Sequence, residues 1–64
     1  MKENVYRINY KNGNSLTTKA LSMILDGGKL YQLCKYYPFD NPTPSILNGI
    51  NIKSIELIER NNDI

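Results

Sequence analysis

The chain has 64 residues and a mass of 7.4 kDa, with 8 basic and 6 acidic side chains, no His, no Trp and one Cys. Without His the chain lacks the most common general base and the most common neutral metal ligand, and one Cys cannot form a disulfide within the chain. The net charge of +2 is too small, and its basic residues too scattered, to indicate strong electrostatic binding of nucleic acid. These counts predict a single small domain that folds on its apolar core, with no catalytic, metal or cofactor site.

The first predicted element is a β-hairpin. Residues 5–10 alternate polar and apolar side chains and are rich in β-formers, and a second strand over 14–18 follows a turn. A three-residue turn that ends at Gly13 pairs Ile8 with Leu16 and places the apolar residues of both strands on one face. A two-residue turn would divide them between the two faces, so the three-residue turn is the predicted register.

The pattern then changes from a period of two to a helical spacing. Residues 20, 21, 24 and 25 are apolar, which is the spacing of one helix face, and Gly27 follows where helices commonly end. We therefore predict a helix over 19–26. The alternative is a second strand that runs on to Leu25, with the residues from Asp26 onward as a second hairpin turn.

The middle of the chain is less regular. Residues 29–37 fit either a short helix that ends before Pro38 or a strand, and as a strand they would carry Leu and Tyr on both faces with no polar side. Residues 38–49 contain prolines and Asn-Gly or Asp-Asn pairs, which predict an ordered Pro-rich loop.

The C-terminal part is predicted to be a strand over 50–58, because it contains four Ile and one Leu, followed by a frayed tail over 60–64. The apolar residues change parity near Lys53 and Ser54, which indicates a β-bulge there or two buried faces. The predicted fold class is therefore α+β: an N-terminal hairpin, one or two short helices and a C-terminal strand that completes an antiparallel or mixed sheet.

Enzymatic sites are hard to build from these residues. Glu56 and Glu59 are three apart and would point to opposite faces of a strand, so they do not form a carboxylate pair. The Gly-Gly-Lys segment that follows Asp26 lacks the spacing of a phosphate-binding loop and is expected to be a turn. Cys34 lies in an apolar stretch and is expected to be a small buried hydrophobe. We therefore expect a protein that is not an enzyme.

The strongest candidate binding segment is aromatic. Tyr36, Tyr37 and Phe39 fall within one stretch of four residues, which a proline stiffens, and Asp40 follows directly. Tyr gives a large contact area at a low entropic cost, so these four residues are the predicted partner-binding site. The alternative is that the rings cap the open end of a small core.

A second candidate is the basic and aromatic content of the hairpin, where Arg7, Lys11 and Lys19 would contact single-stranded nucleic acid. The predicted register counts against it, because Tyr6 and Tyr10 share the face of Ile8 whereas Arg7 points the other way.

The composition suggests a setting as well. Asn, Ile, Lys and Tyr, which have A/T-rich codons, make up 28 of the 64 residues. In style, the short length, this bias and the lack of catalytic groups resemble the small accessory proteins of phages and prophages, although no segment can be aligned. The sequence predicts a cytoplasmic, non-enzymatic protein-binding module that inhibits or adapts a host protein by steric occlusion. Single-stranded nucleic-acid binding and self-association, as a homodimer, are the alternatives; no membrane segment is expected.

Overall fold

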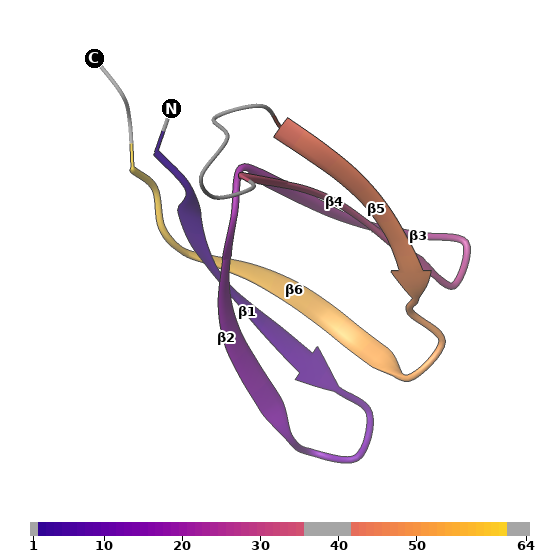
Figure 1. The fold of residues 1–64 in the computed structure, drawn as a ribbon. Helices are drawn as coiled ribbons and strands as arrows, with labels where there is room; N and C mark the ends of the chain where they lie inside the picture. Colours follow the sequence, from indigo (N-terminus) through magenta and orange to yellow (C-terminus); the bar gives the residue numbers. More distant parts are fainter. Residues whose placement is uncertain (1, 36–41, 62–64) are drawn as a thin grey trace.

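The computed structural model describes residues 2–35 and 42–61, and these residues form six β-strands. The strands are β1 (Asn4–Tyr10), β2 (Ser15–Ala20), β3 (Ser22–Asp26), β4 (Lys29–Lys35), β5 (Pro42–Asn48) and β6 (Ile52–Glu59). They make two three-stranded antiparallel sheets, β2-β1-β6 and β3-β4-β5, which share one core (Figure 1). The described residues contain no helix, so the predicted α+β class is wrong and the protein is a small all-β domain.

The N-terminal hairpin has the predicted register. Ile8 pairs with Leu16, and the turn is closed by the Tyr10 N–H, which donates to the Asn14 carbonyl at 2.8 Å, and by the Gly13 N–H, which donates to the Tyr10 carbonyl at 3.1 Å. Gly13 has a φ of 92°, the left-handed conformation that this bulge turn requires. The hydrophobic pattern and the turn residue together determine this register.

The predicted helix over 19–26 is wrong, because the chain turns a corner at Leu21 and continues as β3. The Leu21 N–H donates to the Leu33 carbonyl at 2.7 Å, so the corner is bonded to β4. Gly27 and Gly28 then form the turn between β3 and β4, with φ values of 57° and 75°. Two positive φ angles in a two-residue loop define a type I′ hairpin turn, so the double glycine closes a hairpin and does not end a helix.

The strand alternative is correct for the next segment, where β4 is the central strand of its sheet. The predicted Pro-rich loop is wrong from Pro42 onward, because Pro42 and Pro44 belong to β5. Proline lacks the N–H that a central strand must donate, but it is tolerated on an edge strand. β5 pairs with β4 only, on one side, and is therefore an edge.

The predicted C-terminal strand is observed as β6, which pairs with β1. Asn9 pairs with Ser54 whereas Tyr10 pairs with Ile52, which leaves Lys53 as an extra residue. The bulge predicted near Lys53 is therefore confirmed, and it keeps apolar residues on both sides of it turned toward the core.

The end of β6 is tied to the N-terminal segment. The Asn61 N–H donates to the Asn4 Oδ1 at 2.9 Å, and the Asn61 Nδ2 donates to the Glu3 carbonyl at 2.8 Å. The Asn4 Nδ2 donates in turn to the Leu21 carbonyl at 3.3 Å, so this end of the molecule also includes the corner between β2 and β3. Residues 62–64 of the predicted tail lie outside the described residues.

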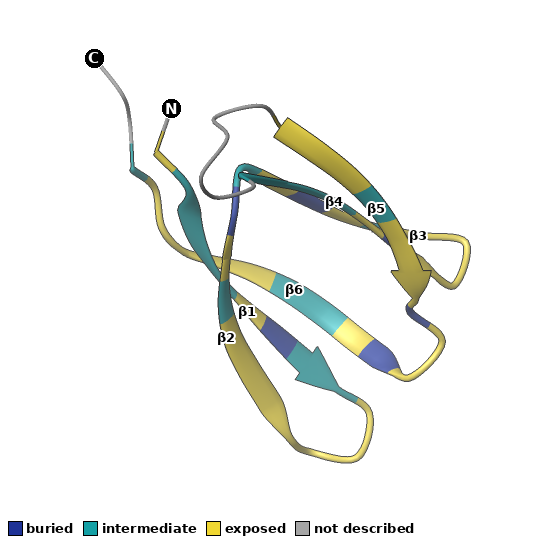
Figure 2. Cartoon of the chain, viewed as in Figure 1, coloured by how far each residue is buried: buried dark blue, intermediate teal, exposed yellow. Residues whose placement is uncertain are grey.

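The core between the sheets is small. Five apolar side chains are at most 8% exposed: Ile8, Ala20, Met23, Leu30 and Ile52. Each of the strands except β5 contributes one of them. Partly buried residues pack around this cluster, namely Tyr6, Tyr10, Leu25, Cys34 and Ile55. Figure 2 shows that β5, in contrast, is exposed along nearly its whole length.

Gly49, in the connection between β5 and β6, joins the two halves of the molecule. Its N–H donates to the Gly28 carbonyl at 2.9 Å, and its carbonyl accepts from the Ile52 N–H at 3.0 Å. A Cβ atom at this position would lie 2.8 Å from the Leu25 Cδ1 and 3.1 Å from the Leu30 backbone nitrogen. The connection can therefore approach the β3–β4 hairpin only because residue 49 has no side chain.

We expect Gly49→Ala to lower the free energy of unfolding by about 1–3 kcal/mol, the usual cost of adding a methyl group where there is no room. Denaturant unfolding followed by circular dichroism measures the change. Asn51→Ala, at an exposed position in the same connection, is the control and should change stability by less than about 0.5 kcal/mol. A Gly49→Ala protein as stable as the parent would contradict the close packing of this connection.

Candidate functional site

The outer face of the β3-β4-β5 sheet carries a row of exposed apolar side chains. Ile24 pairs with Tyr31, and Tyr31 pairs with Ile46, so one residue from each strand lies in the row. Their exposed fractions are 60%, 39% and 62%. In the adjacent row of the same face, Leu33 pairs with Pro44. We call these five residues the Tyr31 face.

The charged groups of this face lie at its ends, and Ser22, which pairs with Leu33, is the polar residue of the adjacent row. Asp26 pairs with Lys29, and Lys29 pairs with Asn48, in the row that follows Ile24, Tyr31 and Ile46. Opposite charges on directly paired residues partly satisfy each other. The centre of the Tyr31 face therefore has no charged side chain, and the charges lie at its two ends, with Lys35 paired to Pro42 in the row beyond Leu33 and Pro44.

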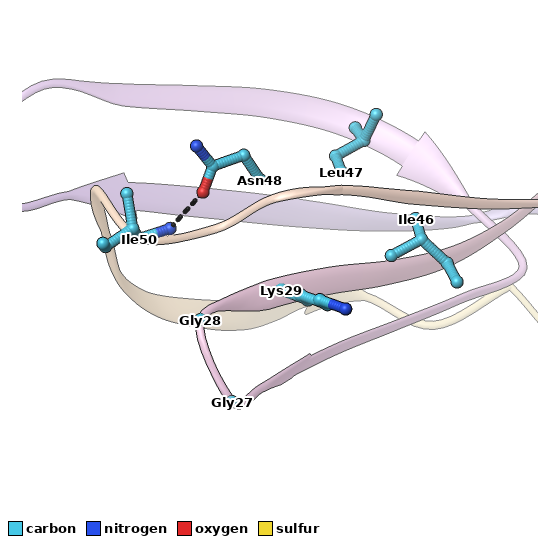
Figure 3. Close-up of a pocket in the computed structure, with 7 residues that line it drawn as sticks. All are labelled: Gly27, Gly28, Lys29, Ile46, Leu47, Asn48 and Ile50. Carbon is cyan, nitrogen blue, oxygen red and sulfur yellow. Dashed lines mark hydrogen bonds between the residues drawn. The ribbon is translucent and has the colours of Figure 1, made fainter.

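A shallow hollow of about 400 Å³ continues the apolar surface around the end of β5. The Gly27-Gly28 turn, Leu47 and Ile50 line it together with Ile46, and Figure 3 shows these residues around the end of the strand. The Ile50 N–H donates to the Asn48 Oδ1 at 3.1 Å, which holds the loop that carries Ile50. Leu47 and Ile50 are 47% and 60% exposed, so the apolar surface extends beyond the sheet.

The outer face of the other sheet is polar. The Asn9 Nδ2 donates to the Glu56 Oε1 at 2.6 Å and to the Ser54 Oγ at 3.2 Å. The Arg7 Nη1 lies 3.9 Å from the Glu56 Oε1, and both side chains are exposed. An exposed ion pair contributes little to stability, but it neutralises Arg7. This face has the polar, internally paired surface expected of a solvent-facing sheet.

The residues predicted to bind single-stranded nucleic acid do not form a joint site. Arg7 and Lys19 share the polar face of β1 and β2, whereas Lys11 lies in the turn at the end of the hairpin. As predicted, Tyr6 and Tyr10 are on the core side and partly buried. Base stacking needs aromatic rings beside the cations, and the described residues of this face supply none.

Lys19 also borders a second hollow, of about 370 Å³, at the end of the molecule where Glu3 lies beside Asn61. Lys2, Glu3, Lys35 and Asn61 are its other lining residues. The Glu3 Oε2 accepts a hydrogen bond from the Lys35 backbone N–H at 3.1 Å. The carboxylate therefore offsets part of the positive charge of this hollow.

The predicted partner-binding residues Tyr36, Tyr37, Phe39 and Asp40 lie outside the described residues. The described residues contain no group of three or more carboxylate or thiol side chains arranged to hold a metal ion. In the part of the chain that the structure describes, no helix is long and apolar enough to cross a membrane. The comparisons add no relative: we find no significant match to a protein-family model, to a curated protein or to a solved structure.

The Tyr31 face was missed at the sequence level because residues 19–26 were assigned to a helix. A signal for it was present, since residues 29–37 read as a strand carry apolar side chains on both faces. Considered in the sequence alone, the lack of a polar side counts against a strand. It is expected, however, of a strand that is covered on both faces.

Cys34 is a free thiol packed against the core, but it is only partly buried, whereas the sequence predicts a small buried hydrophobe. Burial raises the pKa of the Cys34 thiol above its ordinary value, and the nearby carboxylate of Glu3 raises the pKa further. Since the thiolate is the reactive species, a raised pKa makes this Cys a poor nucleophile at neutral pH.

We expect Cys34 in the folded protein to react with iodoacetamide several-fold more slowly at pH 8 than in the urea-unfolded chain, because less of it is thiolate and it is partly covered. Mass spectrometry of time points measures the rate. Glu3→Gln, which keeps a hydrogen-bond acceptor for Lys35, should lower the pKa and increase the rate. Equal rates in folded and unfolded protein would contradict the raised pKa.

Proposed function

We propose that the protein is a non-enzymatic protein-binding module that binds its partner through the Tyr31 face. The observation that carries this proposal is the row of Ile24, Tyr31 and Ile46, three directly paired residues with large exposed side chains. Single exposed apolar residues are common on protein surfaces, but a contiguous group of them marks an interaction site.

The chemistry of the face favours a protein as the partner. Tyr31 lies on the central strand between two Ile side chains, and a central aromatic residue surrounded by aliphatic ones is the usual composition of an interface hot spot. A charge-free centre with charges along its border matches the depletion of charge in interface cores. Such a surface acts by covering its partner, so steric occlusion is the proposed mode of action.

No observation favours nucleic acid in the same way. Arg7 is paired with Glu56, and the tyrosines of the hairpin face the core. The Tyr31 face itself has cations only at its border. We therefore place the single-stranded nucleic-acid alternative second.

The test is photo-crosslinking in cells that express the chain. A benzophenone amino acid replaces Tyr31, and in a matched variant it replaces Ser15, which lies on the polar outer face of the other sheet. We expect at least about fivefold more covalent protein adduct from position 31, because that position lies at the centre of the proposed interface.

Nuclease treatment before electrophoresis separates the two classes of partner. Adducts at position 31 that survive nuclease support a protein partner. Equal adduct from both positions, or adducts at position 31 that nuclease removes, would contradict the proposal. Circular dichroism of both purified variants must show native strand content, so that unfolding does not account for a difference.

A further inference from the structure

We propose that the partner of the Tyr31 face is a second copy of this chain, packed face to face on the same surface in a two-fold symmetric dimer. This inference rests on the proposed function, since it names the occupant of the same site. Four observations support it: the difference between the two outer faces, the symmetry of the row, the available area and the prolines of β5.

The two sheets differ on their outer faces in a way that indicates a missing layer. The β2-β1-β6 sheet is apolar toward the core and polar outside, where Asn9 and Arg7 contact Glu56. The β3-β4-β5 sheet carries apolar side chains on both sides, with Leu30 buried inside next to the polar pair Gln32 and Ser45, and Tyr31 exposed outside. A sheet with two apolar faces is stable as a middle layer. The layer that is missing over Tyr31 must itself present an apolar face.

A second copy presents such a face with matching dimensions. Tyr31 is the middle residue of its row and lies on the middle strand. A two-fold axis near Tyr31 therefore brings the same apolar row onto itself, as an isologous interface requires. Packed sheets lie about 10 Å apart, and side chains from the two facing sheets interdigitate in the space between them. The side chains of Ile24 and Ile46 are large enough to fill this space. Asp26 and Lys29 would lie at the rim, where they keep contact with water.

The accessible surface area of the chain is large enough to contain a standard dimer interface. The accessible surface is 4841 Å², compared with about 4,200 Å² for a typical monomer of this mass. A standard interface of about 800 Å² per partner would cover about one sixth of this surface. Only five apolar side chains are buried between the sheets, and the interface would add a second apolar layer on the other side of β3-β4-β5.

The prolines of β5 favour packing through the face over pairing through the edge. β5 is an edge strand, and an open edge can also add a strand from a second copy. Pro42 and Pro44 lie on this strand, and proline on an edge is a common obstacle to such pairing. β3, at the opposite side of the sheet, is its other edge, so Ile24 on β3 and Ile46 on β5 together distinguish packing through the face from pairing through either edge.

Sedimentation equilibrium of the purified chain tests the inference over about 1–500 μM, the range in which a weak or moderate dimer dissociates. We expect a mass twice that of the 7.4 kDa chain at the upper concentrations, and a melting temperature that rises with concentration. Ile24→Lys should raise the dimer dissociation constant at least about 100-fold, because it places an unpaired charge in the interface. Ser15→Lys adds the same charge to the polar face and should leave the dissociation constant within about twofold.

Ile46→Lys provides a second variant in case Ile24→Lys disturbs the fold, and circular dichroism checks both. A chain that stays monomeric at every concentration overturns the inference, as does a dimer that persists in both folded Lys variants. A dimer lost in only one of the two folded Lys variants would indicate pairing through the edge strand that carries that residue, and also overturns it. A monomer that still forms nuclease-resistant adducts at position 31 would leave the proposed function standing with a different protein as partner.

Discussion

The packing of the two sheets around five buried side chains is the constraint on which the rest of the structure depends. Every strand except β5 contributes one of these side chains, so no strand pair can be removed without opening the core. The sheets are joined at the Leu21 corner and at Gly49, where backbone hydrogen bonds connect one hairpin to the next. In a chain of 64 residues, a core of this size holds only some of the apolar side chains, and the others stay exposed.

The uncovered residues are not distributed evenly. Five of the eight exposed large apolar side chains lie on the outer face of the β3-β4-β5 sheet or around the end of β5, and the other three, Leu16, Leu57 and Ile58, lie on β2 and β6. The outer face of the β2-β1-β6 sheet carries paired polar groups instead of a row of this kind. A protein that needed only to fold would expose polar residues on both outer faces. The asymmetry therefore connects the fold to the proposed function, because the apolar face has a role only when something covers it.

Several features of the fold were predictable from local patterns. The hairpin register follows from the alternation around Ile8 and from Gly13, and the bulge at Lys53 follows from a change in parity. The helix over 19–26 was wrong, and residues 29–37 stayed open between a helix and a strand, because short apolar runs fit a helical period and a strand equally well when both faces of the strand are apolar. The same ambiguity hid the Tyr31 face, since Ile24 and Tyr31 fall on different predicted elements and become neighbours only through the β3–β4 pairing.

The sequence by itself determined the small size, the near-neutral charge and the lack of His, and it determined local features that depend on neighbouring residues, such as the N-terminal turn. The tertiary structure alone decided which apolar residues are buried. Leu30 and Tyr31 are adjacent in sequence and comparable in apolar size, yet one is 2% exposed and the other 39%. Their difference arises because successive side chains of a strand point to opposite faces and the second sheet covers only one of them. Which face is covered depends on long-range packing at the Leu21 corner and at Gly49, and no local pattern contains that information.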